Sequence, residues 1–454
     1  MEISTHSLTL SLSECIVNAH PSKEALQAAQ QGVMDYIAVC FAGRNNVGVK
    51  KLITLYSHKS EKNGVPIIGQ EICLPHYEAS LINGFLGHVL DFDDVHSEVR
   101  GHPSTVILPA LISVVSMQDI FTYKNFLAAY CVGVEVMARL GNAIGSEHFV
   151  RGWHNTSTLG VIAATAAIGY LKHFSKEQIA KAIGFAVTQA SGLRVQFGTE
   201  AKPLHAGLAA QAALRSIDFV EVDLGGTLYA LDGILGFFHV YGQGENFAKP
   251  LLLKGWNVSW KIVSPGLWFK IYPFCSAAHH AADAARELLA KYTISSHQIQ
   301  NVRVVFPSTS DDAALVYKNP KTGEEGRFSV EYVLSLIFND YPLSLKFFNQ
   351  EPIQNNIYKF MSKISRVYDN SIRPAPDAIP SGRFTIIEVI LTDGKMYHIR
   401  VDTPKGCPKN PLSLKDQAQK LKTCIDDELL SFKVIHKLFS VDYGESMKSF
   451  FDFT

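Results

Sequence analysis

The chain is organised around one stretch, Gly87-His-Val-Leu-Asp-Phe-Asp-Asp-Val-His-Ser-Glu-Val-Arg-Gly-His-Pro-Ser-Thr-Val-Ile-Leu-Pro109. Apolar segments with helical spacing flank it on both sides. Its middle nevertheless holds seven titratable side chains within twelve positions: Asp91, Asp93, Asp94, His96, Glu98, Arg100 and His102. Titratable groups between buried helices lose their hydration, so they need partners or a chemical role. A solvated loop that caps two helices is the simpler alternative.

Length and composition indicate a large, ordered globular protein. The 454 residues predict more than one domain, and the 47% hydrophobic and 19% charged residues argue against disorder. Lys plus Arg equals Asp plus Glu at 42 each, so no overall field attracts nucleic acid or an anionic membrane. An anionic substrate would therefore have to be held by a few local cations.

The cysteines and the first residues predict a cytoplasmic protein. Seven scattered cysteines form no CxxC pair, which is typical of reduced thiols and not of a disulfide framework or a structural zinc site. The start, Met1-Glu-Ile-Ser-Thr-His-Ser7, lacks the basic and apolar pattern of a secretory signal. The longest apolar run, near residues 159–171, is too short to span a membrane, so no membrane partner is expected.

Helical spacing dominates the first part of the chain. Ser22 and Ser104 are plausible N-caps, and Ser175 begins a capping box that ends at Gln178. The helices expected from this spacing cover residues 22–42, 49–58, 75–90, 105–117, 122–144, 157–171 and 175–192. Small residues recur along them and allow close packing, so residues 1–267 are predicted to form one large all-helical bundle domain.

Strand signals follow in the next part. Residues 300–307, 384–391 and 396–401 are predicted strands, and Asp393-Gly394 predicts a hairpin between the last two. Helices are expected at 277–292 and 329–338, which makes 268–402 a smaller α/β domain. Residues 403–454 are predicted to be helical, starting from the cap Ser413, and to complete the helical domain. The predicted fold class is thus mostly α with an α/β (α+β) second domain.

No familiar catalytic motif is present. The chain lacks GxGxxG, Walker A, GxSxG and HExxH patterns, so nucleotide-binding, acyl-transfer and zincin chemistry have no signal. Asp91, Asp93, Asp94 and His96 have short spacing and ligand chemistry that a divalent cation accepts. The Gly and terminal Glu of an EF-hand are missing, however, and the metal interpretation is not favoured. Taken one at a time, the remaining His, Lys and Cys residues have ordinary structural explanations.

Taken together, the polar segments resemble a known family. In order along the chain they are Asp91-Phe-Asp-Asp94, Gly101-His-Pro-Ser104, Lys202-Pro-Leu-His205, Tyr272-Pro-x-Cys275-x-x-x-His279, Thr322-Gly-x-Glu-x-x-Phe-Ser329-x-x-Tyr332 and Asn410-Pro-Leu-Ser413. Their order and spacing are similar to those of the MmgE/PrpD family, over nearly the whole chain. The family includes enzymes that dehydrate 2-methylcitrate, decarboxylate cis-aconitate or epimerise iminodisuccinate.

The resemblance implies an enzyme without metal or organic cofactor, usually a homodimer, whose α/β domain closes over the helical domain. It also implies which residues act on a small di- or tricarboxylate. The catalytic candidates are His102, Asp91, His154 and Tyr317. The substrate-binding candidates are Lys202, Lys270, His205, Cys275 and His96.

Chemistry supports these roles. A substrate with two or three carboxylates suits clamps from Lys202 and Lys270. Fixed positive charge also stabilises an enolate-like anion beside a carboxylate. Imidazoles titrate in the range needed to give or take a proton at carbon, so His102 or His154 could do this. Asp91 would orient a histidine or raise its basicity, and Tyr317 could donate a hydrogen bond or a proton.

Two positions depart from the family pattern. Val95 stands where many members carry Thr or Tyr, and Cys275 stands where some carry His. The segment Asp93-Asp-Val-His-Ser-Glu98 and Trp153-His154 are more similar to the pattern of the decarboxylating members. The expected activity is therefore decarboxylation of cis-aconitate to itaconate, with dehydration of 2-methylcitrate second and epimerisation of iminodisuccinate third. A non-catalytic binding protein on the same fold is the alternative from another class.

Overall fold

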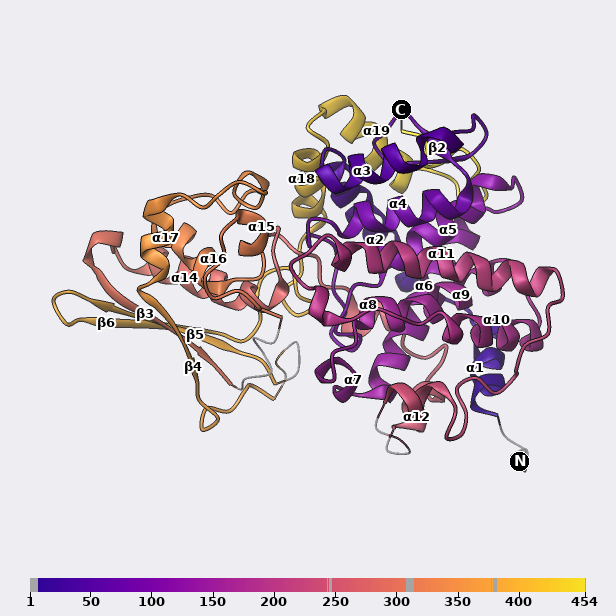
Figure 1. Ribbon diagram of the computed structural model, residues 1–454, viewed down its shortest axis with the longest axis horizontal. Coiled ribbons are helices and arrows are strands. Elements are labelled where there is room, and N and C mark those ends of the chain that lie inside the picture. Colours follow the sequence, from indigo (N-terminus) through magenta and orange to yellow (C-terminus); the bar gives the residue numbers. More distant parts are fainter. Residues whose placement is uncertain are drawn as a thin grey trace.

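A computed structural model of the chain describes residues 7–242, 244, 247–307, 314–376, 378 and 382–453. Two main hydrophobic cores divide these residues between two lobes. The helical lobe has its core residues within 8–269 and 412–451, and the α/β lobe has its core residues within 272–401. Figure 1 shows the two lobes side by side, with the α/β lobe on the left. The predicted combination of a mostly helical fold with a smaller α/β part is confirmed.

The helical lobe is a bundle in which most helices are buried on more than one side. Its longer helices are α1 Leu8–Val17, α2 Lys23–Gly43, α3 Val47–Tyr56, α4 His76–His88, α5 Ser104–Met117, α6 Tyr123–Ile144, α9 Gly160–Leu171, α10 Lys176–Thr188 and α11 Ala201–Glu221. Short helices join them: α7 Glu147–Val150, α8 Asn155–Thr158, α12 Phe237–Tyr241 and α13 Lys249–Leu253. A two-stranded ribbon, β1 Val65–Pro66 and β2 Cys73–Leu74, precedes α4.

Helix starts in this lobe follow the predicted caps with one exception. The Ser22 side chain accepts from the Ala25 amide, and Ser175 and Gln178 form the expected capping box. Ser104, in contrast, is the first residue of α5 and makes no cap; its hydroxyl contacts the Asp94 carboxylate instead. Ser104 cannot be the N-cap because it already lies inside the first turn of α5, where Pro103 precedes it at the cap position.

The α/β lobe contains one four-stranded sheet of order β4-β3-β5-β6. The strands are β3 Ile299–Phe306, β4 Ile364–Tyr368, β5 Thr385–Leu391 and β6 Met396–Val401, and the β5–β6 hairpin is antiparallel as predicted. Helices α14 His279–Lys291, α16 Val330–Phe338 and α17 Asn355–Met361 lie together on one side of the sheet (Figure 1). Strand β4, parallel to β3, was missed because a five-residue edge strand with a single buried side chain carries little apolar pattern.

The C-terminal helices return to the helical lobe. Helices α18 Leu414–Ile425 and α19 Glu428–Phe439 pack against α2, and Ser413 caps α18 as predicted. The buried Lys420 ammonium donates to Asp35 Oδ1 at 2.7 Å and to the Phe92 carbonyl at 3.0 Å. The end of the chain therefore supports the acidic loop that follows α4.

One described helix, α6, is long and apolar enough to cross a membrane by length and composition alone. However, 89% of its most apolar window is buried within the bundle. Its hydrophobicity is that of a core helix.

Helices α4 and α11 cross at close range, backbone against backbone. A Cβ added at Gly84 would lie 2.7 Å from the Gly207 Cα, and one added at Gly207 would lie 2.1 Å from the Leu81 carbonyl oxygen. Only glycines allow the two backbones to approach this far. Because α4 leads into the acidic loop and α11 begins beside Lys202, the crossing sets the distance between the two halves of the site.

We expect Gly207→Ala to destabilise the protein by about 1–3 kcal/mol, because the added methyl group forces α11 away from α4. Thermal unfolding followed by circular dichroism measures the effect. Gly225→Ala is the matched control, since a Cβ at this exposed position meets no atom within 4 Å. Equal midpoints for the two variants would contradict the packing argument.

Candidate active site

The acidic loop between α4 and α5, residues 89–103, has a fixed backbone. Val95 and Trp268 exchange backbone hydrogen bonds of 2.9 and 2.8 Å, and His96 pairs with Gly101 within the loop. Asp91 itself has φ of +50°, a left-handed conformation that costs energy for a residue with a side chain. Strong interactions must therefore hold it.

Asp91 is held by two ammonium groups. Lys202, in the first turn of α11, places Nζ 2.5 Å from Asp91 Oδ1. Lys270, in the segment that joins the lobes, places Nζ 3.0 Å from Asp91 Oδ2 and donates to the Asp91 carbonyl at 2.6 Å. All three side chains are at most 5% exposed. Burial alone raises the pKa of the Asp91 carboxyl, but the two ammonium groups hold it well below its usual range.

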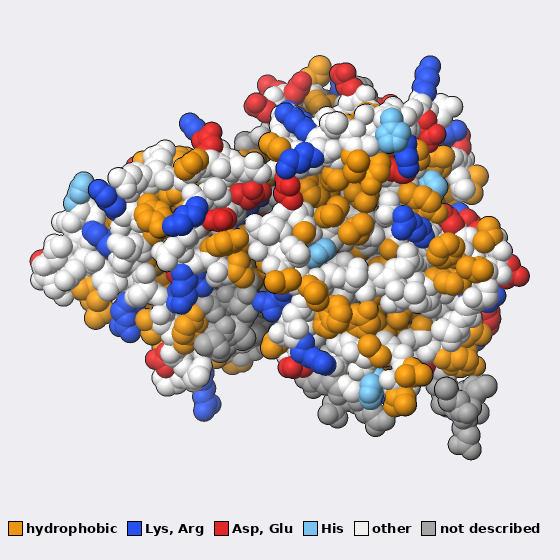
Figure 2. All heavy atoms as spheres, viewed as in Figure 1, with side chains coloured by type: hydrophobic (Ala, Val, Ile, Leu, Met, Phe, Trp, Pro, Cys, Tyr) orange, Lys and Arg blue, Asp and Glu red, His pale blue; other side chains and the backbone are white. Residues whose placement is uncertain are grey.

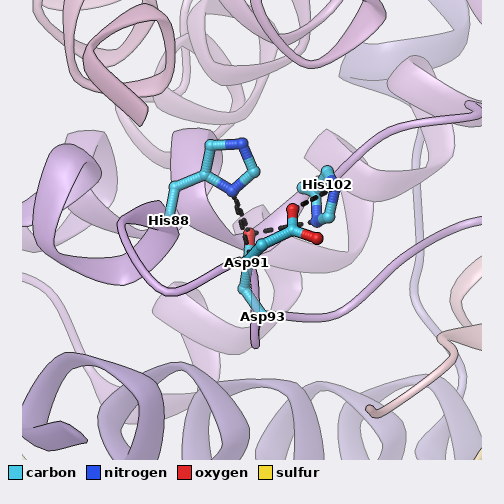
Figure 3. Close-up of side chains that lie close together, drawn as sticks. All are labelled: His88, Asp91, Asp93 and His102. Atoms are coloured by element: carbon cyan, nitrogen blue, oxygen red, sulfur yellow. Dashed lines mark hydrogen bonds and ion pairs between the residues drawn. The ribbon is translucent and has the colours of Figure 1, made fainter. Parts of the chain in front are cut away.

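Asp93 is the carboxylate of a second cluster, which contains two histidines (Figure 3). Its Oδ2 lies 2.9 Å from His88 Nδ1 and 3.2 Å from His102 Nδ1. His102 Nε2 is 3.7 Å from Asp91 Oδ1, so this imidazole lies between two carboxylates. The rings of His88 and His102 are 4.5 Å apart. The acidic loop and the last residue of α4 thus bring two acids and two imidazoles together.

His88, the last residue of α4, is buried and bonded at both ring nitrogens. Nδ1 faces Asp93, and Nε2 lies 3.0 Å from Lys202 Nζ. Burial lowers the pKa of His88 to about 3, although the Asp93 carboxylate acts in the opposite direction. The ring is therefore neutral near pH 7.

His154 extends the row of imidazoles toward α11. It precedes α8, and its ring stacks on that of His88 with centroids 5.9 Å apart. Its Nδ1 lies 3.1 Å from His205 Nδ1, so one of the two nitrogens donates and the other accepts. Burial, and then the Lys202 charge, lower the pKa of His154 well below its usual range. His154 is a neutral hydrogen-bonding group.

The α/β lobe supplies the opposite wall. Arg327 is buried, donates from Nη1 to the Val89 carbonyl at 2.7 Å, and also bonds the Phe348 carbonyl. Tyr317 packs on Gly198, where any Cβ would lie 2.4 Å from the tyrosine ring. A pocket between the lobes is lined by the end of α4, the start of α11 and, from the α/β lobe, Glu324, Arg327 and Phe328.

The structure brings most of the predicted residues together. Asp91, His102, His154, Lys202, Lys270 and His205 form one continuous cluster. Cys275 is buried within electrostatic range of Asp91 and Lys270, and burial raises the pKa of its thiol. Tyr317 lies at the edge, against the pocket residue Gly198.

His96, which was predicted to bind substrate, is the exception. Its Nε2 lies 3.0 Å from the Lys261 carbonyl, and its Nδ1 accepts from the Glu98 amide at 3.3 Å. With both ring nitrogens occupied and the side chain fully buried, it supports the loop and offers no contact to a substrate.

Three residues of the site were missed or misplaced. Asp93 was not among the catalytic or substrate-binding candidates, yet it is 1% exposed and pairs with two imidazoles. His88 and Arg327 were not selected at all. The available signals were the helical spacing of His88 to Asp91 and the position of Arg327 inside the Thr322 to Tyr332 motif. Neither signal tells a buried cation or imidazole from a surface one.

The described residues include one group with the composition of a metal site. His88, Asp91, Asp93 and His102 each offer a ligand atom, all within 4.8 Å of one another. Both Asp91 oxygens, however, already face ammonium groups, which would repel a divalent cation. The set suggested by sequence spacing is also divided, since Asp94 and His96 have partners elsewhere. The geometry favours an anionic ligand.

Asp94 points away from the pocket into the helical core. Its carboxylate accepts from the Ser104 amide at 3.3 Å and contacts the Ser104 hydroxyl, which in turn contacts the Tyr130 hydroxyl. Burial, together with the nearby Asp35 and Asp93 charges, raises the pKa of Asp94 to about 8. Asp94 is therefore protonated at neutral pH and serves as a hydrogen-bonding core residue.

The sequence matches the profiles of a known family and several named proteins over most of its length. The profile of the MmgE/PrpD N-terminal domain matches residues 12–250, and that of the MmgE/PrpD C-terminal domain matches residues 272–431. Cis-aconitate decarboxylase from Homo sapiens is 26% identical over 93% of this chain and 88% of its own length. The Mus musculus enzyme of that name is 24% identical over 89% and 83%, and that of Aspergillus terreus is 23% identical over 88% and 85%.

We expect Asp94→Asn to flatten the pH dependence of stability between about pH 4 and pH 8. The folded protein keeps the Asp94 proton that the unfolded chain releases above pH 4, so stability from this group is present at low pH and lost as pH rises through 8. The loss is at most about 1.4 kcal/mol per pH unit. Urea unfolding at pH 5 and pH 8 measures it, with the exposed Glu287→Gln as control. A slope equal to that of the wild type would disprove the assignment.

Proposed function

Since the chain belongs to the MmgE/PrpD family, we propose that it is a lyase that decarboxylates cis-aconitate to itaconate without a cofactor. The observation that carries the proposal is the pair of buried ammonium groups on Asp91, beside a row of imidazoles that reaches a pocket between the lobes at His88. The names of the similar proteins direct it to cis-aconitate.

The charges of the pocket suit a polycarboxylate. Lys202, Lys270 and Arg327 are buried cations, and two of them line the pocket directly. Arg327 Nε is buried and has no hydrogen-bond partner among the described residues, so it is a donor that a bound carboxylate would satisfy. Of the acidic residues in the wall, Glu200 pairs with Lys51 at 3.1 Å and Glu324 lies 3.7 Å from Arg327. A tricarboxylate would find separate cations for separate carboxylates.

The reaction requires positive charge beside one carboxylate of the substrate and a proton at the carbon next to that carboxylate. When the carboxylate on the methylene carbon leaves as carbon dioxide, the electron pair of the broken bond forms the new double bond. The old double bond moves its electrons to the carbon beside the far carboxylate, giving an enolate-like anion. One proton added at that carbon completes itaconate. Ammonium groups fixed beside the far carboxylate stabilise the anion as its charge develops.

We assign the proton transfer to His102. Its ring lies between the Asp91 and Asp93 carboxylates, which would pair with an imidazolium, and its side chain is 11% exposed. His154 is less suited, since burial keeps that ring neutral, and a hydrogen bond to the substrate is the role we propose for it. Asp91 orients both lysines, and Tyr317 closes the edge of the pocket. The homodimer that the family resemblance implies is likewise a proposal.

We expect purified protein incubated with cis-aconitate to produce the two vinylic proton signals of itaconate in a ¹H NMR time course. The activity should persist in a metal chelator, because the groups that stabilise the anion are Lys and Arg side chains. Parallel incubations with 2-methylcitrate and iminodisuccinate test the alternative activities. Turnover of one of these alone would redirect the proposal, and no turnover of any of the three would refute it.

We expect Lys202→Ala to lower kcat/KM by about 100-fold or more, since a buried charged donor to the substrate is lost. Lys395→Ala, at an exposed position in the β5–β6 turn, is the control and should retain full activity. Steady-state kinetics with cis-aconitate measure both variants. Near-full activity of Lys202→Ala would rule out its role as a carboxylate clamp.

A further inference from the structure

We propose that His88 is a positioning residue of this site, which holds the Lys202 ammonium so that one of its N–H groups points to the substrate. The inference deepens the proposed function and rests on it for the nature of the ligand. Neither the sequence motifs nor the comparisons assign a role to His88. Its position between Asp93 and Lys202 carries the argument.

The His88 ring is buried between two charged partners. His88 is 1% exposed at the C-terminal end of α4 and lines the pocket beside Lys202. Asp93 Oδ2 lies 2.9 Å from Nδ1, and Lys202 Nζ lies 3.0 Å from Nε2. Both contacts have hydrogen-bond distances, so the imidazole connects a carboxylate to an ammonium group.

The tautomer of the His88 ring follows from the charge of Asp93. The nearby His102 and His88 rings hold the pKa of Asp93 well below its usual range despite burial, so its carboxylate can only accept. His88 Nδ1 must then carry the ring proton. Because the ring is neutral, Nε2 keeps its lone pair and accepts from the Lys202 ammonium. Asp93 thereby determines which way the His88–Lys202 bond runs.

The Lys202 ammonium group has one N–H donor left for a ligand. A lysine has three N–H donors in a tetrahedral arrangement. His88 Nε2 takes one and Asp91 Oδ1 takes another, and among the described residues no third acceptor contacts Lys202 Nζ. Two fixed directions determine the third. The aromatic rings of Phe197 and Phe328, with centroids 5.5 and 5.3 Å from Nζ, further confine the group.

Removal of the His88 acceptor would change the direction of the donors, although the charge would stay. The ammonium could then turn both free N–H groups toward the Asp91 carboxylate, which is its strongest partner. Binding of the substrate would have to undo that rearrangement. The ammonium charge that stabilises the developing anion stays in place, whereas a misdirected donor already weakens the contact with the substrate carboxylate on binding, so the loss should fall mainly on KM.

The test compares two isosteres of histidine. In His88→Asn the side-chain nitrogen can replace Nδ1 and keep the bond to Asp93, but nothing reaches Lys202. In His88→Gln the side-chain oxygen can replace Nε2 and accept from Lys202. We expect His88→Asn to raise KM for cis-aconitate about 10–100-fold with a smaller change in kcat, and His88→Gln to recover most of the loss. Equal KM values for the two variants, or a loss confined to kcat, would overturn the proposal.

A second readout is independent of the reaction. Calorimetric titration with propane-1,2,3-tricarboxylate, which cannot lose its carboxylate by the same route, should give the same order of affinities: wild type and His88→Gln above His88→Asn. If the wild-type protein binds and converts no polycarboxylate, the proposed function fails. The positioning proposal is then decided by crystal structures of the three proteins.

Those structures should show Lys202 Nζ within hydrogen-bond distance of residue 88 in the wild type and in His88→Gln, and displaced toward Asp91 in His88→Asn. An unchanged Nζ in His88→Asn would refute the positioning role. Should His88→Asn fail to fold, the Gln variant decides alone, because loss of the Nζ contact or of affinity in a folded His88→Gln protein contradicts the acceptor argument.

Discussion

The interaction on which the rest of the site depends is the buried pairing of Asp91 with Lys202 and Lys270. A buried carboxylate or ammonium alone would cost several kcal/mol in lost hydration, so neither lysine could remain in the interior without this acid. The pairing also holds Asp91 in its left-handed conformation. Lys202 lies in the first turn of α11 and Lys270 in the connection between the lobes. The Asp91 carboxylate therefore ties both segments to the acidic loop.

The acidic loop assigns its charges to different environments over a few residues. Asp91 and Asp93 face the cations and imidazoles of the pocket and are ionised, whereas the adjacent Asp94 faces the core and is protonated. Neighbouring side chains point in different directions along this irregular backbone, so no separate structural element is needed to place them in different environments. The same physical rule, that burial disfavours charge unless a partner compensates it, gives opposite results at neighbouring positions.

The Asp91 pairing also explains why the site is a poor match for a metal ion although its acids and imidazoles resemble metal ligands. The composition of a site does not decide its ligand, because the ammonium groups already occupy the carboxylate oxygens that a metal would need. The pocket is then lined by the Lys202 and Arg327 cations and the neutral His88 ring, while its acids Glu200 and Glu324 face Lys51 and Arg327. The α/β lobe adds Arg327, whose bond to the Val89 carbonyl links the lobe to the same loop.

The sequence by itself determined the helical part, the α/β part, the caps at Ser22, Ser175 and Ser413 and the β5–β6 hairpin, because these follow from local spacing. It also determined most of the polar cluster, through the order of its motifs. It did not determine the edge strand β4, the partner of Ser104, the separation of His96 from the pocket, or the place of His88, Asp93 and Arg327 in it. Those depend on which groups from distant segments meet in the interior. A buried carboxylate or imidazole is defined by its partners, and only the tertiary structure brings them together.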